Sequence, residues 1–342
     1  MIKERYLHID ALKALSIILI ILIHILSYSL DTRLRFQIWN YLHFVVIAFV
    51  FSSGYVLTAV YANKIKTLPQ VKNWIIKRIK RLLLPYYIYL FTHFSLAYFL
   101  KNLFVSGRIK LSLGFLTASI ALTGGVDLKW FVVLFLQLTL IFALFLLVRS
   151  KKTYLAISFI LGSIASIIFI FKPFQPYEAF MFLSWENILF LGSLFFLFEK
   201  KMPKARTRLI YLLSSLAAFF IFLILSRGKE IVFTQNKYPP NLIYFAYGVS
   251  ITTFLLFIFQ SFILLLYLIR QPIEFISRYS YQLFFAHYIA IDNALSLKRF
   301  IPASFKFSFF VVSTIILSFF YLLIWIKLSR LIKSLQNSMK LK

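Results

Sequence analysis

Four ionisable side chains, Asp10, Lys13, His24 and Asp31, interrupt the apolar stretch near the start of the chain. On an α-helix that turns about 100° per residue, Lys13 and His24 lie about 20° apart around the axis and about 16 Å apart along it. Asp10 and, if the helix continues that far, Asp31 fall within about 40° of His24. We therefore expect one polar stripe along this helix, and a histidine within it could accept a proton from a hydroxyl near neutral pH.

A purely structural explanation competes with a chemical one for each of these residues. Lys13 and Asp10 could extend to the membrane surface, and for Lys13 alone we favour that interpretation. His24 could simply form a hydrogen bond with a neighbouring helix. His24 would lie about two-thirds of the way across a membrane, where an ionisable group is costly, so we favour a functional role.

Two arginines, Arg78 and Arg81, follow the second long apolar run and share one helical face because they are three residues apart. Pro85 would fit the first turn of the next helix, where its missing N–H costs nothing. Two guanidinium groups placed together could bind phosphates through paired hydrogen bonds. On charge alone, an anchor to lipid headgroups explains the cluster better.

Other polar positions carry weaker signals. Ser53 belongs to a group of small residues that favours close helix packing, and Trp130 could be an anchor at the membrane surface. His287 lies deep in an apolar run, and the sequence leaves structural and functional roles equally open for it. We expect His43 and His93 to be structural.

The elements that position these residues are membrane helices. Of the 342 residues, 61% are hydrophobic and only 14% are charged, far from the composition of soluble domains. A run from residue 111 to 123 is too short to span and predicts a re-entrant or interfacial helix. Ten runs are long enough to span a bilayer, and they lie at residues 11–30, 40–62, 86–104, 129–148, 153–171, 180–198, 208–226, 241–269, 279–296 and 307–328.

The net charge of +28 would suggest nucleic acid in a soluble protein, but here the charges fall between the apolar runs. Most Lys and Arg residues lie in segments on the same side as the N-terminus, which predicts that both termini are cytoplasmic in a multi-pass cell-membrane protein that also contacts anionic lipid. Residues 1–30 read as a retained helix rather than a cleaved signal. We expect an all-α polytopic fold with one transmembrane domain over residues 1–342, and no nucleic-acid partner.

Several chemistries lack support. The chain has no Cys, which excludes a thiol nucleophile and a zinc–thiolate site. Walker A, G-x-G-x-x-G, H-E-x-x-H and G-x-S-x-G patterns are also missing. We expect no metal and no permanently bound cofactor.

Taken together, the motifs resemble the integral-membrane acyltransferase family 3, whose members include O-acetyltransferases of bacterial surface polysaccharides and intercellular-adhesion relatives. The resemblance covers nearly the whole chain. Two departures are that the basic position of the first helix is Lys where Arg is commoner, and that the extra C-terminal extracytoplasmic domain of some members is missing. The motifs are Lys13 and His24 after Asp10, Ser52-Ser53-Gly54-Tyr55, Arg78 and Arg81 before Pro85, Trp130, and Ser280-Tyr281 with His287.

The resemblance implies that an acyl group, usually acetyl from cytoplasmic acetyl-CoA, is transferred to a hydroxyl of an extracytoplasmic glycan or lipid-linked sugar. On that basis Arg78 and Arg81 would hold the phosphates of CoA with help from Lys13. The pantetheine arm would lie along the first helix. The donor is thus acetyl-CoA or another acyl-CoA, with the acyl group open between acetyl, succinyl and a longer chain.

The same resemblance implies that His24 acts as general base on the acceptor hydroxyl or as a transient acyl carrier, with Asp31 orienting it. Trp130, His287 and Ser53 would contribute to substrate binding. Neither the acceptor's identity nor an oligomeric state follows from the motifs.

Two other functions compete with the enzyme. A transporter or flippase of a lipid-linked sugar or anionic substrate could also use buried polar groups, but the paired Gly/Pro breaks expected of two related halves are not evident. A structural or scaffold protein would leave the polar stripe without a purpose.

Overall fold

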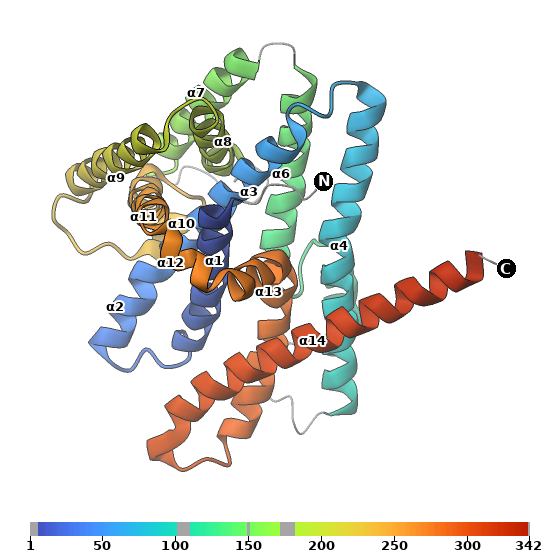
Figure 1. The fold of residues 1–342 in the computed structure, drawn as a ribbon. Coiled ribbons are helices and arrows are strands. Elements are labelled where there is room, and N and C mark those ends of the chain that lie inside the picture. Colours follow the sequence, from blue (N-terminus) through green and yellow to red (C-terminus); the bar gives the residue numbers. More distant parts are fainter. Residues whose placement is uncertain (1–5, 101–109, 149–150, 172–181, 341–342) are drawn as a thin grey trace.

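The computed structural model describes residues 6–100, 110–148, 151–171 and 182–340. Within these ranges the chain is helical apart from turns and short connections, and β-type pairing is limited to an isolated bridge between Lys237 and Pro240. Figure 1 shows the helices, which are α1 (Leu7–Leu26), α2 (Arg33–Tyr41), η1 (Leu42–Phe44), α3 (Val45–Tyr61), α4 (Leu68–Phe99), α5 (Leu113–Ile120), α6 (Lys129–Leu147), α7 (Lys151–Ile168), α8 (Phe182–Glu199), α9 (Lys204–Ser226), α10 (Phe233–Lys237), α11 (Leu242–Ser261), α12 (Ile263–Leu268), α13 (Arg270–Lys298), η4 (Ala303–Phe305) and α14 (Lys306–Lys340).

The prediction of an all-α polytopic membrane protein is confirmed. Among the described residues, nine helical segments are long and apolar enough to cross a bilayer, with α2, η1 and α3 counted as one and η4 with most of α14 as another. The expected crossing at residues 279–296 falls inside α13, which has 29 residues and would be about 43 Å long. Counting α13, the structure agrees with about ten crossings.

The helix that carries the two arginines differs from the prediction. We expected a new helix to begin near Pro85, but α4 begins at Leu68 and contains Pro85 in its interior. The start is set by Thr67, whose side chain and that of Gln70 form a reciprocal capping box. Proline is tolerated inside a membrane helix because neighbouring groups satisfy the backbone that it frees. Arg78 and Arg81 therefore lie within a continuous helix.

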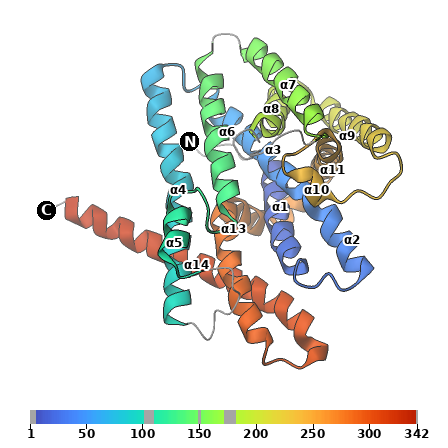
Figure 2. The ribbon, with the colours of Figure 1, turned by 180° about the vertical axis from the view of Figure 1, so that it is seen from behind.

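The short helix α5 packs against α4. It has eight residues and would be only about 12 Å long, too short to span. The hydroxyl of Tyr86 donates to the carbonyl of Ser119 at 2.7 Å, and that of Tyr87 to the carbonyl of Ile120 at 3.2 Å. These bonds hold the end of α5 beside the middle of α4 (Figure 2). Helix α6 begins at Lys129, after a turn of the chain that follows α5.

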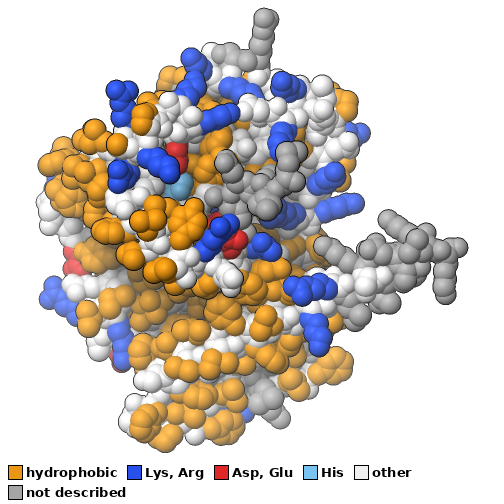
Figure 3. Space-filling view, viewed as in Figure 1, with side chains coloured by type: hydrophobic (Ala, Val, Ile, Leu, Met, Phe, Trp, Pro, Cys, Tyr) orange, Lys and Arg blue, Asp and Glu red, His pale blue; other side chains and the backbone are white. Residues whose placement is uncertain are grey.

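Helix α1 is the centre of the bundle and contacts α2, α3, α11, α12, α13 and α14 (Figure 1). Large apolar side chains lie exposed on the outer helices, for example Phe220 of α9, Leu268 of α12 and Ile316 of α14. Hydrophobic side chains dominate the lower part of the face in Figure 3, whereas Lys and Arg gather over its upper part. Exposed apolar surface of this extent is what a lipid-facing protein presents.

Candidate active site

The polar side chains of α1 line two separate cavities. Lys13 lines one of them and His24 the other. Both side chains belong to one buried helix, so their relative positions are fixed by its rise of about 1.5 Å per residue.

The first, which we call the histidine cavity, has a volume of about 210 Å³. Side chains from α1, η1, α6, α10 and α13 line it, and its walls are mainly aromatic with a few basic groups. Its lining includes His24, His43, Trp130, Phe131, Phe284, Lys237, Tyr238 and Tyr288. The structure therefore places two of the predicted residues, His24 and Trp130, in one cavity.

His24 is half-buried and lies against two side chains of α13. Its ring centroid is 5.2 Å from that of His287 and 4.8 Å from that of Tyr288. The Tyr288 hydroxyl is 3.3 Å from Nε2 of His24. His287 is fully buried, and its Nδ1 lies 3.3 Å from the Leu283 carbonyl. The structure thus brings together the predicted pair His24 and His287 and adds Tyr288.

Asp31 does not join this group. Helix α1 ends at Leu26, and the hydroxyl of Ser27 donates to the His24 carbonyl at 2.8 Å. The polar stripe therefore ends before Asp31, whose carboxylate pairs instead with Arg35 at 2.5 Å. The hydrogen bond from Arg35 lowers the pKa of Asp31 below its ordinary value. The predicted contact of Asp31 with His24 assumed a longer helix than the structure contains.

The second, which we call the basic cavity, is smaller, at about 60 Å³. Four of the predicted residues line it together with Arg278, which sequence reasoning missed; the four are Lys13, Ser53, Arg78 and Arg81. Three arginines and a lysine meet there, and the described lining contains no Asp or Glu. The Nε of Arg78 is buried without a hydrogen-bond partner in the described part of the chain. Such a set of donors suits a polyanion, above all phosphate.

Four aromatic rings, which we call the aromatic layer, connect the walls of the two cavities. Phe131 and Phe284 line the histidine cavity, while Phe135 and Tyr281 line the basic cavity. The centroid of Phe131 is 4.2 Å from that of Phe284 and 4.7 Å from that of Phe135, and its ring stacks on Tyr281 at 6.2 Å. A packed apolar layer therefore separates the arginines from the histidines.

Residues 6–326 match the family model described as "Acyltransferase domain", that of acyltransferase family 3. The chain belongs to acyltransferase family 3. It is a membrane acyltransferase, which favours the enzyme over the transporter and the scaffold. Among curated proteins and solved structures, none matches the chain significantly.

This family 3 acyltransferase also contains a buried ionisable pair that we did not predict. His93 of α4 lies with Nε2 2.7 Å from the Asp292 carboxylate of α13, and with Nδ1 3.0 Å from the Tyr89 hydroxyl. His93 and Asp292 are 2% and 0% exposed, so each compensates for the burial of the other. Asp292 follows Tyr288 by four residues, which places them on the same face of α13. The sequence signal that could have indicated this pair was the presence of Asp292 within an apolar run.

Lys237 and Arg278 are the two further basic residues of the acyltransferase that sequence reasoning missed. Lys237 ends α10 and lines the histidine cavity, and burial lowers its pKa to about 7. Arg278 comes from α13, two residues before the Ser280-Tyr281 pair that carried part of the resemblance. Within the described ranges, no group of three or more His, Cys, Asp or Glu side chains is placed to hold a metal ion.

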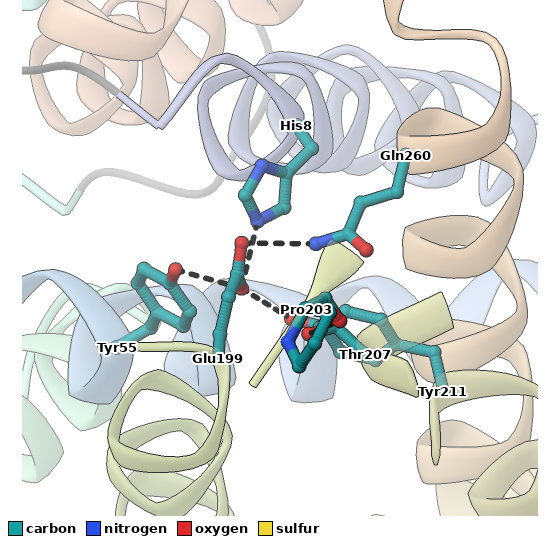
Figure 4. A network of polar contacts seen from close by, with 7 residues as sticks. All are labelled: His8, Tyr55, Glu199, Pro203, Thr207, Tyr211 and Gln260. Atoms are coloured by element: carbon teal, nitrogen blue, oxygen red, sulfur yellow. Dashed lines mark hydrogen bonds and ion pairs between the residues drawn. The ribbon is translucent and has the colours of Figure 1, made fainter. Parts of the chain in front are cut away.

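A second polar network of the acyltransferase fixes the start of α1 (Figure 4). The Glu199 carboxylate accepts hydrogen bonds from Tyr55 at 2.8 Å, Tyr211 at 3.1 Å and Gln260 at 3.0 Å. His8 Nε2 lies 3.3 Å from the same carboxylate. These contacts connect α1 with α3, α8, α9 and α11. The network therefore helps to hold the helix that carries Lys13 and His24.

Proposed function

We propose that this acyltransferase transfers an acyl group, with acetyl as the leading candidate, from cytoplasmic acyl-CoA to a hydroxyl of an extracytoplasmic glycan or lipid-linked sugar. The observation that supports this most directly is that Lys13 and His24, on the same helix, line two cavities of different chemistry. A donor with phosphates and an acceptor with a hydroxyl need two such sites. The positive charge at the basic cavity favours the cytoplasmic side for it.

The donor would bind through its phosphates to the basic cavity. Arg78, Arg81 and Arg278 offer planar guanidinium groups, and Lys13 adds a fourth cation from α1. A cavity of about 60 Å³ has space for only a few water-sized groups, which is too little for a nucleotide. The nucleotide of CoA would therefore bind at the mouth of this cavity, and the thinner pantetheine arm would extend toward the aromatic layer.

The acceptor hydroxyl would lie against His24. His24 accepts the hydroxyl proton while the oxygen attacks the thioester carbonyl carbon, so that a C–O bond forms and the C–S bond breaks. The proton then passes from the imidazolium to the departing CoA thiolate, which leaves as the thiol. Tyr288, 3.3 Å from Nε2 of His24, would orient the ring. If His24 instead carried the acyl group, an acylated protein would accumulate without acceptor.

The first test compares purified enzyme with a His24→Ala variant. We expect acyl transfer to fall about 10²- to 10⁴-fold, the usual contribution of a general base, while the Kd for acyl-CoA stays unchanged because the basic cavity is intact. Equal acyl transfer by the two proteins would overturn the mechanism.

The second test concerns the donor site and uses neighbouring residues of α4. We expect Arg78→Ala to raise the KM for acyl-CoA about 10- to 100-fold, because a hydrogen bond between charged groups contributes roughly 1.5–3 kcal/mol. Lys77→Ala removes the same charge from an exposed position outside the cavity and is the matched control. Equal KM values for both variants would contradict phosphate binding in this cavity.

A further inference from the structure

Lys237 is a buried cation inside the histidine cavity. It is 8% exposed, and its ammonium lies 5.2 Å from the ring centroid of Trp130 and 4.9 Å from that of Tyr238. Within the described ranges no carboxylate forms an ion pair with it. The two rings are thus the charge-stabilising contacts that the structure gives to this lysine.

These contacts compensate only in part for burial. Removing an ammonium from water costs much more than cation–π contacts return, and burial lowers the pKa of Lys237 to about 7. A leucine or methionine could fill the same space without that cost. The position therefore suits a group that gains an anionic partner when the cavity is occupied.

The other walls of the cavity favour an anion as well. The remaining titratable side chains that line it are His24 of α1, His43 of η1, Tyr238 after α10 and Tyr288 of α13, and the described lining has no Asp or Glu. Aromatic faces such as Trp130 provide an apolar wall against which a ring-shaped ligand can lie. The volume of about 210 Å³ leaves room for a small ligand unit beside His24.

We propose that the histidine cavity binds an acidic acceptor unit, in which Lys237 pairs with a carboxylate or phosphate close to the hydroxyl that is acylated. This inference rests on the proposed function and names the substrate class of the same site. Pairing with Lys237 would fix the orientation of the acceptor and so determine which hydroxyl faces His24.

The test uses three soluble saccharides of equal length as acceptors: a neutral one, one with uronic acids and one with phosphorylated sugars. With purified enzyme and radiolabelled acetyl-CoA, we expect at least one acidic acceptor to be preferred. Lys237→Met should lower kcat/KM for that acceptor about 100-fold, in the range for a lost buried ion pair, and should lower it much less for the neutral acceptor. The two acidic acceptors distinguish carboxylate from phosphate.

Two variants serve as controls. Lys229→Met removes a charge at an exposed position in the segment between α9 and α10 and should behave like the unsubstituted enzyme. Lys237→Arg keeps the charge and should keep the preference for acidic acceptors. Equal use of neutral and acidic acceptors by the unsubstituted enzyme would overturn the proposal. An equal loss for all three acceptors in Lys237→Met would also overturn it, since that is the signature of a structural role.

Binding without acyl-CoA separates this inference from the proposed function. Calorimetry with the three saccharides should show tighter binding of an acidic one, lost in Lys237→Met. That result supports the anion site even if no acyl transfer is observed, in which case the proposed function alone would fail. Equal binding of all three saccharides would overturn the anion site.

Discussion

The contact between α3 and α8 allows a sharp prediction, because it joins two backbones without a side chain between them. A Cβ atom built on Gly54 would lie 1.7 Å from the carbonyl oxygen of Leu189. Carbon and carbonyl oxygen atoms normally approach to about 3.3 Å at the closest. In Gly54→Ala the two helices would therefore have to separate by about 1.6 Å, since no rotamer change can move a backbone carbonyl.

We expect Gly54→Ala to lower the free energy of unfolding by about 3 kcal/mol, the upper end of the range for overpacking. Helix α3 also brings Phe49 and Ser53 to the basic cavity, so the KM for acyl-CoA should rise as well. Thermal unfolding in detergent, followed by tryptophan fluorescence, measures the first effect. Steady-state kinetics measures the second.

Gly114→Ala is the matched control. Gly114 lies in the exposed part of α5, and a Cβ there would have no atom within 4 Å, so the variant should unfold at the same temperature or slightly higher. If Gly54→Ala unfolds at the same temperature as Gly114→Ala and the unsubstituted protein, the close approach of α3 and α8 is refuted.

Three further perturbations test other parts of the structure. Asp292→Asn should destabilise the protein by about 3–5 kcal/mol, because it breaks the buried pair with His93; an unchanged unfolding temperature would contradict that pairing. The pKa of Lys237 falls from 10.5 to about 7 on folding, so the unfolded chain binds more protons between these pH values and stability should rise from pH 7 towards pH 10.5. Comparing unfolding at pH 7 and pH 9 in the unsubstituted protein and in Lys237→Met checks this, since the variant should lose that part of the slope. Phe131→Ala should open the aromatic layer and increase acyl-CoA hydrolysis without acceptor relative to acyl transfer, measured as free CoA released; unchanged hydrolysis would argue against a sealing role.

The sequence predicted the arrangement of residues correctly wherever helical periodicity or the length of a segment alone determines it. The angle between Lys13 and His24 depends only on helical periodicity, so their common direction from α1 could be predicted before any contact was known. In the same way, the three-residue spacing of Arg78 and Arg81 predicted that both lie on one face of a helix. The short run at residues 111–123 predicted a helix that could not span, because length alone decides that.

Other features depend on helix ends and on partners far away in the chain. Asp31 was misplaced because Ser27 follows the end of α1, and apolar composition does not mark that boundary. The partner of His93 is 199 residues away, a distance over which no local pattern carries information.

The aromatic layer explains how binding energy at one cavity can serve chemistry at the other. A continuous water-filled path past four cations would let anions cross the membrane, so a packed apolar layer is needed between the cavities. On the proposed function, the thioester must nevertheless pass Phe131 to reach His24. Each ring contact stabilises the closed layer by about 0.5–1.5 kcal/mol, and the three contacts that Phe131 makes within the layer by a few kcal/mol together. Charge-assisted hydrogen bonds to CoA phosphates contribute roughly 1.5–3 kcal/mol each, so two or three of them suffice to part the rings. Acyl-CoA would then open the layer by binding, and the layer would remain closed when the donor is absent.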